Sequence, residues 1–221
     1  MSAWVLALLG LLHSDLSLFR TSAGRDSDLI VYVSAGRNQP AAPLEIMKRE
    51  LSGIMESAGY RLVYGDPRAP DPDGHYSSLA VLELRGACGM PGANSHVERA
   101  VLSGASLAET SVSSGVVLPF SRIDCANLTR LIGPALADEP RAQRDWLYGR
   151  AMARLAAHEL YHVMMGSRDH CRRGVAKASF SVNDLLDDGF DFDGVALALL
   201  RRKAAEGLAR TDTSGEPAAR R

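Results

Sequence analysis

Two histidines four residues apart, His158 and His162, are the strongest chemical feature of the chain, and Glu159 lies between them. On an α-helix this spacing puts both imidazoles on one face, one turn apart, so both rings can reach a single ion. Glu159 is offset by one position, where a carboxylate can take a proton from a water molecule. The motif therefore predicts a hydrolytic zinc site with His158 and His162 as ligands and Glu159 as general base.

A third ligand is required, because catalytic zinc sites combine three protein ligands with one open position. His170 is the first candidate, since the chain can turn at Gly166 and bring this side chain back toward the ion. Asp169 and Asp184 are competitors, because carboxylates also bind zinc. No glutamate occurs between residues 159 and 206, so the sequence does not favour a downstream glutamate ligand.

A long helix has to carry the motif, and the sequence predicts it over residues 140–165, ended by Gly166. The histidines share a stripe with apolar residues and should face the protein interior, whereas Arg150, Arg154 and Tyr161 form a more polar strip. Tyr161 points away from the histidine stripe and is expected to pack. Buried imidazoles need polar partners, and a metal ion would satisfy both rings.

The remaining elements are read from hydrophobic periodicity and from glycine and proline boundaries. The pattern predicts strands over 28–36, 60–65 and 78–88, a hairpin of 106–112 and 115–121, and helices over 43–59, 124–132, 180–188 and 192–207. This order favours an α+β fold, in which a small mixed sheet is flanked by helices and the C-terminal part is helical.

The composition is that of a folded globular domain. The chain has 221 residues, of which 46% are hydrophobic and 23% charged, and its formal net charge is −1. This charge gives no basis for nucleic-acid binding. The body of the chain lacks an apolar run of about 18 residues, so no internal membrane span is expected. The predicted domain covers residues 24–207, followed by a polar, disordered tail over 208–221.

The N-terminal segment differs in character from the rest of the chain. Residues 3–12 carry no charge, which is typical of the apolar part of a secretory signal, so residues 1–23 are interpreted as a signal peptide or N-terminal anchor. The protein is then exported, to the periplasm or the medium. The alternative is that this segment forms a first buried strand or helix of a cytosolic protein.

Three cysteines are present, and an odd number in an exported chain suggests one disulfide and one remaining thiol. Cys88 ends one apolar run and Cys125 follows another, so these two are the favoured pair. Cys171, next to His170, remains either a thiolate ligand or a free thiol.

The helical H-E-x-x-H in an α/β chain resembles the zincin superfamily of zinc metallopeptidases. The resemblance implies a twisted sheet over an active-site helix, zinc as cofactor, and a peptide or protein substrate lying along an edge strand, for which SLAETSV (106–112) is the candidate. The metzincin branch continues H-E-x-x-H-x-x-G-x-x-H. Here HELYHVMMGSRDH has Gly166 one residue later and His170 two residues later, and no methionine follows to form that branch's Met-turn.

Two further resemblances concern the flanking residues. The adjacent His170 and Cys171 resemble archaemetzincins, although the later cysteines of those proteins are missing here. HELYH together with GVAKASFSVNDLL and VVLPFSRIDC is similar to a group of exported bacterial zincin-like proteins of unassigned function. We therefore expect a zinc-dependent peptidase. One alternative is a catalytically inactive zincin-like protein that binds metal or a partner, and another is a structural module with buried histidines and no ion.

Overall fold

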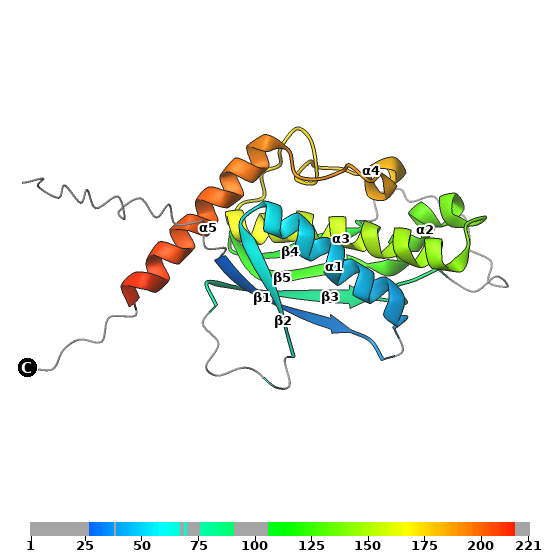
Figure 1. Cartoon of the computed structure of the whole chain (residues 1–221), viewed down its shortest axis with the longest axis horizontal. Helices are drawn as coiled ribbons and strands as arrows, with labels where there is room; N and C mark the ends of the chain where they lie inside the picture. The colour runs from blue at the N-terminus through cyan, green and yellow to red at the C-terminus, as the bar shows by residue number, and fades with distance from the viewer. Residues whose placement is uncertain (1–26, 38, 67–68, 70–75, 91–105, 215–221) are drawn as a thin grey trace, which may run out of the picture.

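The computed structural model describes residues 27–37, 39–66, 69, 76–90 and 106–214. The elements within them are β1 (Ser27–Ala35), α1 (Ala41–Ser57), β2 (Tyr60–Gly65), β3 (Ser78–Arg85), β4 (Ala108–Ser113), β5 (Val116–Asp124), α2 (Cys125–Leu136), α3 (Arg141–Met165), α4 (Val182–Leu186) and α5 (Gly194–Ser214). The expected α+β architecture is confirmed: a mixed sheet packs on the histidine helix α3, and the C-terminal part is helical (Figure 1).

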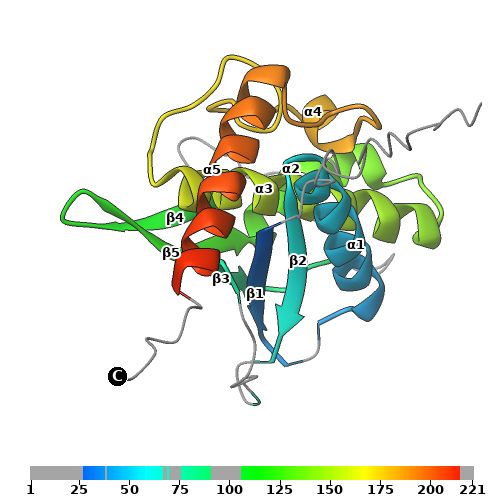
Figure 2. The same cartoon turned by 60° about the vertical axis from the view of Figure 1, so that its left-hand side comes forward.

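The sheet has the strand order β2-β1-β3-β5-β4. The first four strands in this order pair in parallel, and β4 pairs antiparallel with β5. The β4–β5 hairpin turns at Ser114 and Gly115, which both have positive φ, as a two-residue turn matched to strand twist requires. The hairpin extends sideways from the body of the protein (Figure 2). Strand β4 is therefore the edge strand predicted over 106–112.

Helices α1 and α3 cover one face of the sheet (Figure 1). On β3 the buried residues Ala80, Leu82 and Leu84 alternate with more exposed ones, so one side of the strand faces the helices. Across this interface Met47 and Leu51 of α1 are fully buried in the same core. This core fixes where α3 lies relative to the sheet, and with it the histidines.

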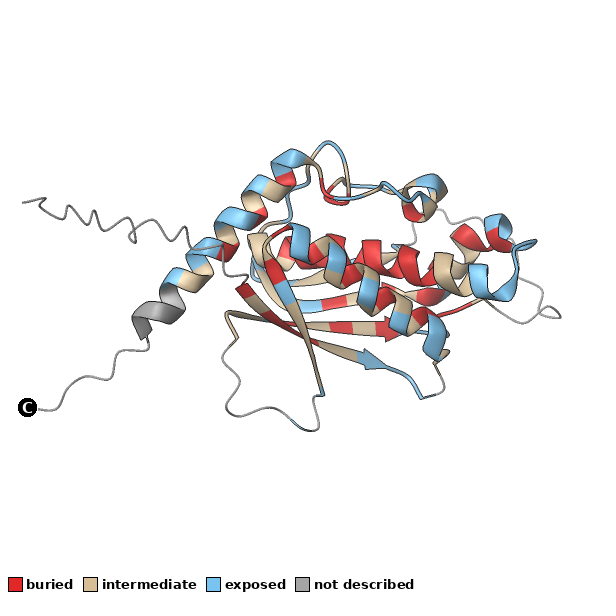
Figure 3. Cartoon of the chain, in the orientation of Figure 1, coloured by how far each residue is buried: buried red, intermediate tan, exposed pale blue. Residues whose placement is uncertain are grey.

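Helix α3 is the most deeply buried helix among those described, and every residue from Tyr148 to His162 is buried (Figure 3). The expectation of a more polar strip is therefore corrected: Arg150 and Arg154 are buried too. The C-terminal segment with α4 covers this side of α3. Gly149 permits a close crossing with α1, because an added Cβ would lie 2.6 Å from the carbonyl oxygen of Pro43.

Several boundaries differ from the sequence expectation. Helix α2 continues to Leu136, and α5 continues to Ser214, so α5 includes residues assigned to the polar tail. The alanine, leucine and arginine residues of α5 are strong helix formers. The predicted signal (1–23), residues 215–221 of the tail, and the remaining histidines lie outside the described residues. None of the helices in the described part of the chain is long and apolar enough to span a membrane.

A disulfide joins Cys88 and Cys125, the pairing that the sequence favours. The physical reason lies in the sheet, because β3 and β5 are parallel neighbours and the pair Arg85 and Asp124 ends their register. The residues that follow the two strands therefore leave the sheet at the same edge. Cys125 is the first residue of α2, so the bond ties that helix to the end of β3.

Loss of this disulfide should lower the stability of the fold. The bond closes a loop of 37 residues, for which the chain-entropy relation gives about 3–4 kcal/mol of stabilisation. The double variant Cys88→Ser/Cys125→Ser should lose about this free energy of unfolding in urea titrations. Cys171→Ser is the control and should change it by less than about 1 kcal/mol. An equal loss of unfolding free energy in the double variant and in Cys171→Ser would contradict a stabilising role for the disulfide.

Candidate metal centre

The last two turns of α3 place His158 and His162 with their Nε2 atoms 3.1 Å apart. Each Nδ1 lies 2.8 Å from a main-chain carbonyl oxygen, that of Val175 for His158 and that of Ser167 for His162. A carbonyl oxygen can only accept, so each Nδ1 carries the hydrogen and donates it. In neutral rings both Nε2 atoms then hold lone pairs, and they cannot hydrogen-bond to each other. A cation is the natural partner for this arrangement.

Burial keeps both rings neutral. It lowers the pKa of His158 to about 4, assisted by the nearby His162 and His170 and opposed by the hydrogen bond to Val175. Burial also lowers the pKa of His162 from its usual value. Both Nε2 lone pairs are therefore available at neutral pH. The neutral imidazole is the form that binds metals.

The spacing of the two nitrogens fits zinc. With zinc–nitrogen bonds of about 2.0–2.1 Å and tetrahedral angles, two ligand nitrogens lie about 3.3–3.4 Å apart. The Nε2 separation of 3.1 Å is close to this value. Two neutral imidazoles oriented by carbonyl acceptors are also the donor set expected of a zinc site, so the residues present fit this ion.

His170 returns to the pair after the chain turns at Gly166, which ends α3 with φ 60° and ψ 27°. One ligand atom from each of His158, His162 and His170 lies within 4.8 Å of the others. This limit is wider than the distance between two ligand nitrogens on a tetrahedral zinc ion. His170 is the exposed member of the three histidines. Its side chain is therefore the one with room to adjust.

The other candidates for a third ligand are engaged elsewhere. Asp169 accepts a hydrogen bond from Ser167, and Asp184 forms the capping box of α4 and pairs with Lys177 at 2.7 Å. The Sγ of Cys171 lies 3.6 Å from the hydroxyl of Tyr161. Within the described residues, neither carboxylate nor this thiol joins the histidine group.

Glu159 is 3% exposed and receives a hydrogen bond from Thr110 of β4, with 2.6 Å between Thr110 Oγ1 and Glu159 Oε2. Burial raises the pKa of Glu159 to about 7, the hydrogen bond from Thr110 opposes this shift, and the charge of Glu109 adds to it. A carboxyl group with this pKa can both accept and release a proton near neutral pH. The contact with Thr110 was not foreseen from the sequence.

The three histidines and Glu159 line one pocket of about 320 Å³. Its lining includes His158, Glu159 and His162 from α3, His170 and Arg168 from the following turn, and Ala108, Glu109, Thr110, Val112 and Val117 from the hairpin. The edge strand β4 therefore forms one wall of the pocket, beside the histidines. Tyr161 is buried and its ring lies 6.2 Å from that of Phe192, so it packs as expected.

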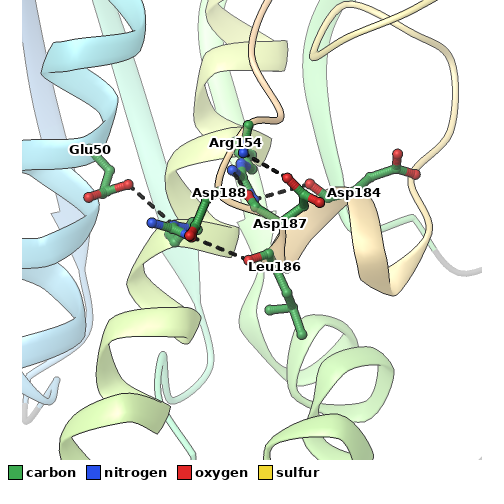
Figure 4. Close-up of polar contacts among 8 residues, drawn as sticks. Glu50, Arg154, Asp184, Leu186, Asp187 and Asp188 are labelled. Carbon is green, nitrogen blue, oxygen red and sulfur yellow. Dashed lines mark hydrogen bonds and ion pairs between the residues drawn. The ribbon is translucent and has the colours of Figure 1, made fainter.

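Two buried arginines of α3 hold the segment that leads into α5. Arg154 donates to the main-chain oxygens of Asp184, at 3.2 Å, and Asp187 (Figure 4). Arg150 donates to the main-chain oxygen of Leu186 at 3.3 Å and to the Asp188 carboxylate. Burial, together with Arg150, lowers the pKa of Arg154 to about 10, so this side chain remains charged at neutral pH.

The two arginines matter to the histidine site because the segment they hold, residues 184–191, also contacts the loop that contains Val175. The Val175 carbonyl accepts from His158, and the Val175 amide donates to Asp191 O at 3.0 Å. Residues 184–191 thus connect the arginine contacts to the carbonyl that orients His158. The burial of Arg150 and Arg154 was missed in the sequence, where arginine on a helix reads as a surface residue.

No protein-family model matches the chain, and no curated protein matches it. Among solved structures the chain is similar to archaemetzincin from Methanopyrus kandleri, with 15% sequence identity and a TM-score of 0.46. The similarity covers 83% of this chain and 98% of that protein. A likeness this distant says nothing about what the chain does, and the chemistry of the site follows from its own residues.

Replacing Arg154 with methionine should destabilise the fold. The change keeps most of the side-chain volume but leaves two carbonyl oxygens without their donor, at a cost of about 2–4 kcal/mol. Thermal and urea unfolding measure this loss. Arg141→Met is the control, because the Arg141 side chain is 88% exposed and should contribute less than about 0.5 kcal/mol. A neutral effect of Arg154→Met would show that the contacts are dispensable.

Proposed function

We propose that the chain is a zinc-dependent hydrolase, and more narrowly a metallopeptidase, with His158, His162 and His170 as zinc ligands. The observation that carries the proposal is the pair of buried Nε2 atoms, 3.1 Å apart, each left with a lone pair because Nδ1 donates to a carbonyl. A buried pair of this kind is unfavourable without a cation, so the fold has a physical reason to bind one.

Glu159 is the proposed general base. When bound, zinc supplies Lewis acidity that polarises a peptide carbonyl and makes water easier to deprotonate. Glu159 would accept the proton of the attacking water and then pass it to the leaving amine. Its pKa of about 7 suits both transfers near neutral pH, and its place on the pocket lining next to His158 gives it access to the reacting atoms.

The substrate is proposed to be a peptide or protein segment in extended conformation. Among the described strands β4 pairs only with β5, so its outer edge is available for pairing with an additional strand. This strand also lines the pocket through Thr110 and Val112, and Val112 is 39% exposed. A peptide paired along β4 would run past the histidines.

We also propose that the protein acts outside the cytosol. The disulfide between Cys88 and Cys125 supports export, since such bonds persist in oxidising compartments and are rare in the cytosol. The uncharged stretch over residues 3–12 supports it independently as the apolar part of a secretory signal.

Glu159→Gln should separate catalysis from metal binding. The variant keeps the shape of the side chain but cannot take up a proton, so peptide cleavage should fall at least about 100-fold while zinc content stays at one per chain. Glu56→Gln, on the exposed face of α1, is the matched control and should retain full activity. An active Glu159→Gln protein would exclude this general base, and a wild-type protein that binds zinc without cleaving peptides would favour the inactive binding protein.

His170→Ala should identify the third ligand. Loss of a ligand should weaken zinc binding by more than about 100-fold, measured by competition with a chelating dye. Asp169→Asn and Asp184→Asn should bind zinc as the wild type does, because their carboxylates are occupied by Ser167 and by the α4 cap. Strong zinc binding by His170→Ala, with loss in either aspartate variant, would reassign the ligand.

A further inference from the structure

The hydroxyl of Thr110 makes the contacts that link the edge strand to Glu159. Its Oγ1 atom lies 2.6 Å from Glu159 Oε2, 3.2 Å from the main-chain oxygen of Glu159, and 3.0 Å from Ser121 Oγ. Thr110 and Ser121 are direct partners in the β4–β5 register. A line of polar atoms therefore runs from β5 through β4 to the carboxylate on α3.

The distances indicate where the single hydroxyl proton of Thr110 goes. The 2.6 Å contact is the length of a hydrogen bond to a carboxylate, whereas the 3.2 Å contact to the carbonyl is long for a hydroxyl donor. Ser121 is buried, and its hydroxyl can donate to Thr110 Oγ1, which leaves the Thr110 proton for Glu159. In this arrangement Thr110 donates to Oε2.

The second carboxylate oxygen of Glu159, Oε1, remains available to a molecule in the pocket. Within the described residues, Glu159 Oε1 makes no hydrogen bond in the structure, while Glu159 itself lines the pocket. An unrestrained carboxylate can rotate about its last bond and present either oxygen, since that torsion is soft. A hydrogen bond to Oε2 removes this freedom and selects Oε1 as the oxygen that meets a substrate water.

We propose that Thr110 is a positioning residue, whose hydroxyl fixes the Glu159 carboxylate in the orientation needed for proton transfer. This inference rests on the proposed function, because it assigns Thr110 a part in the same reaction. The β4 register shifts between Thr110 and Val112, immediately after the residue that holds Glu159. Irregular pairing of this kind re-aims a strand and is frequent beside active sites. The strand proposed to receive the peptide thus also orients the base.

The test compares Thr110→Val with Thr110→Ser. Valine keeps the shape and removes the donor, so kcat should fall roughly 10- to 100-fold, the equivalent of one hydrogen bond to a charged group, with little change in KM. Serine restores the hydroxyl and should restore most of kcat. Ser57→Ala, a hydroxyl deletion at the exposed end of α1 and away from the pocket, should leave kcat unchanged. Zinc content should be the same in all four proteins, and each should remain folded at the assay temperature.

Combination with Glu159→Gln distinguishes positioning from a general structural effect. If Thr110 acts through Glu159, adding Thr110→Val to Glu159→Gln should cause no further loss. A full further 10-fold loss in the double variant would overturn the inference. So would an unchanged kcat in Thr110→Val, or a Thr110→Ser protein as slow as Thr110→Val.

A readout independent of turnover is available in the metal-free protein. The Thr110 hydroxyl proton should be protected from exchange and give a proton NMR resonance that is absent in Thr110→Val and shifted in Glu159→Gln. Absence of this resonance in the wild type would overturn the inference. A wild-type protein that cleaves no peptide overturns the proposed function together with the inference, whereas an active wild type with a fully active Thr110→Val overturns the inference alone.

Discussion

Two main-chain carbonyls determine which nitrogen of each buried histidine on α3 carries the hydrogen and which is left as a possible ligand. Val175 O and Ser167 O each lie 2.8 Å from an imidazole Nδ1, so they fix the tautomer of both rings and turn both Nε2 lone pairs toward the same point. Burial then keeps the rings neutral, because the loss of hydration disfavours the charged imidazolium form. The proposed metal site thus depends on where the backbone runs after α3, as much as on the histidines themselves.

The rest of the fold maintains that geometry from three sides. The sheet and α1 bury α3 through the apolar core, and the close approach at Gly149 lets α1 lie directly on it. On the third side, Arg150 and Arg154 hold the segment before α5, which in turn holds the loop that contains Val175. Two arginines, two histidines and a glutamate can therefore lie in the buried stretch Tyr148–His162 of α3, because each has a polar partner or a proposed ion.

The sequence predicted the strands, the hairpin, the ends of α3, the disulfide and the clustering of three histidines, because periodicity, capping residues and i,i+4 spacing are local properties. It did not predict the burial of Arg154 or the contact between Thr110 and Glu159. Both depend on which segments cover α3, and that is decided by long-range packing. The candidate general base was thus found from its neighbours in the sequence, while the residue that holds it was found only in the folded chain.

X-ray absorption at the zinc edge of the purified, zinc-loaded protein tests the central claim most directly. We predict one zinc per chain, with three imidazole nitrogens at about 2.0–2.1 Å and no sulfur neighbour. His162→Ala should bind no zinc at the same concentration. A spectrum with a sulfur at about 2.3 Å, or a protein that takes up no zinc although it is folded, would contradict the claim that these facing imidazoles bind the ion.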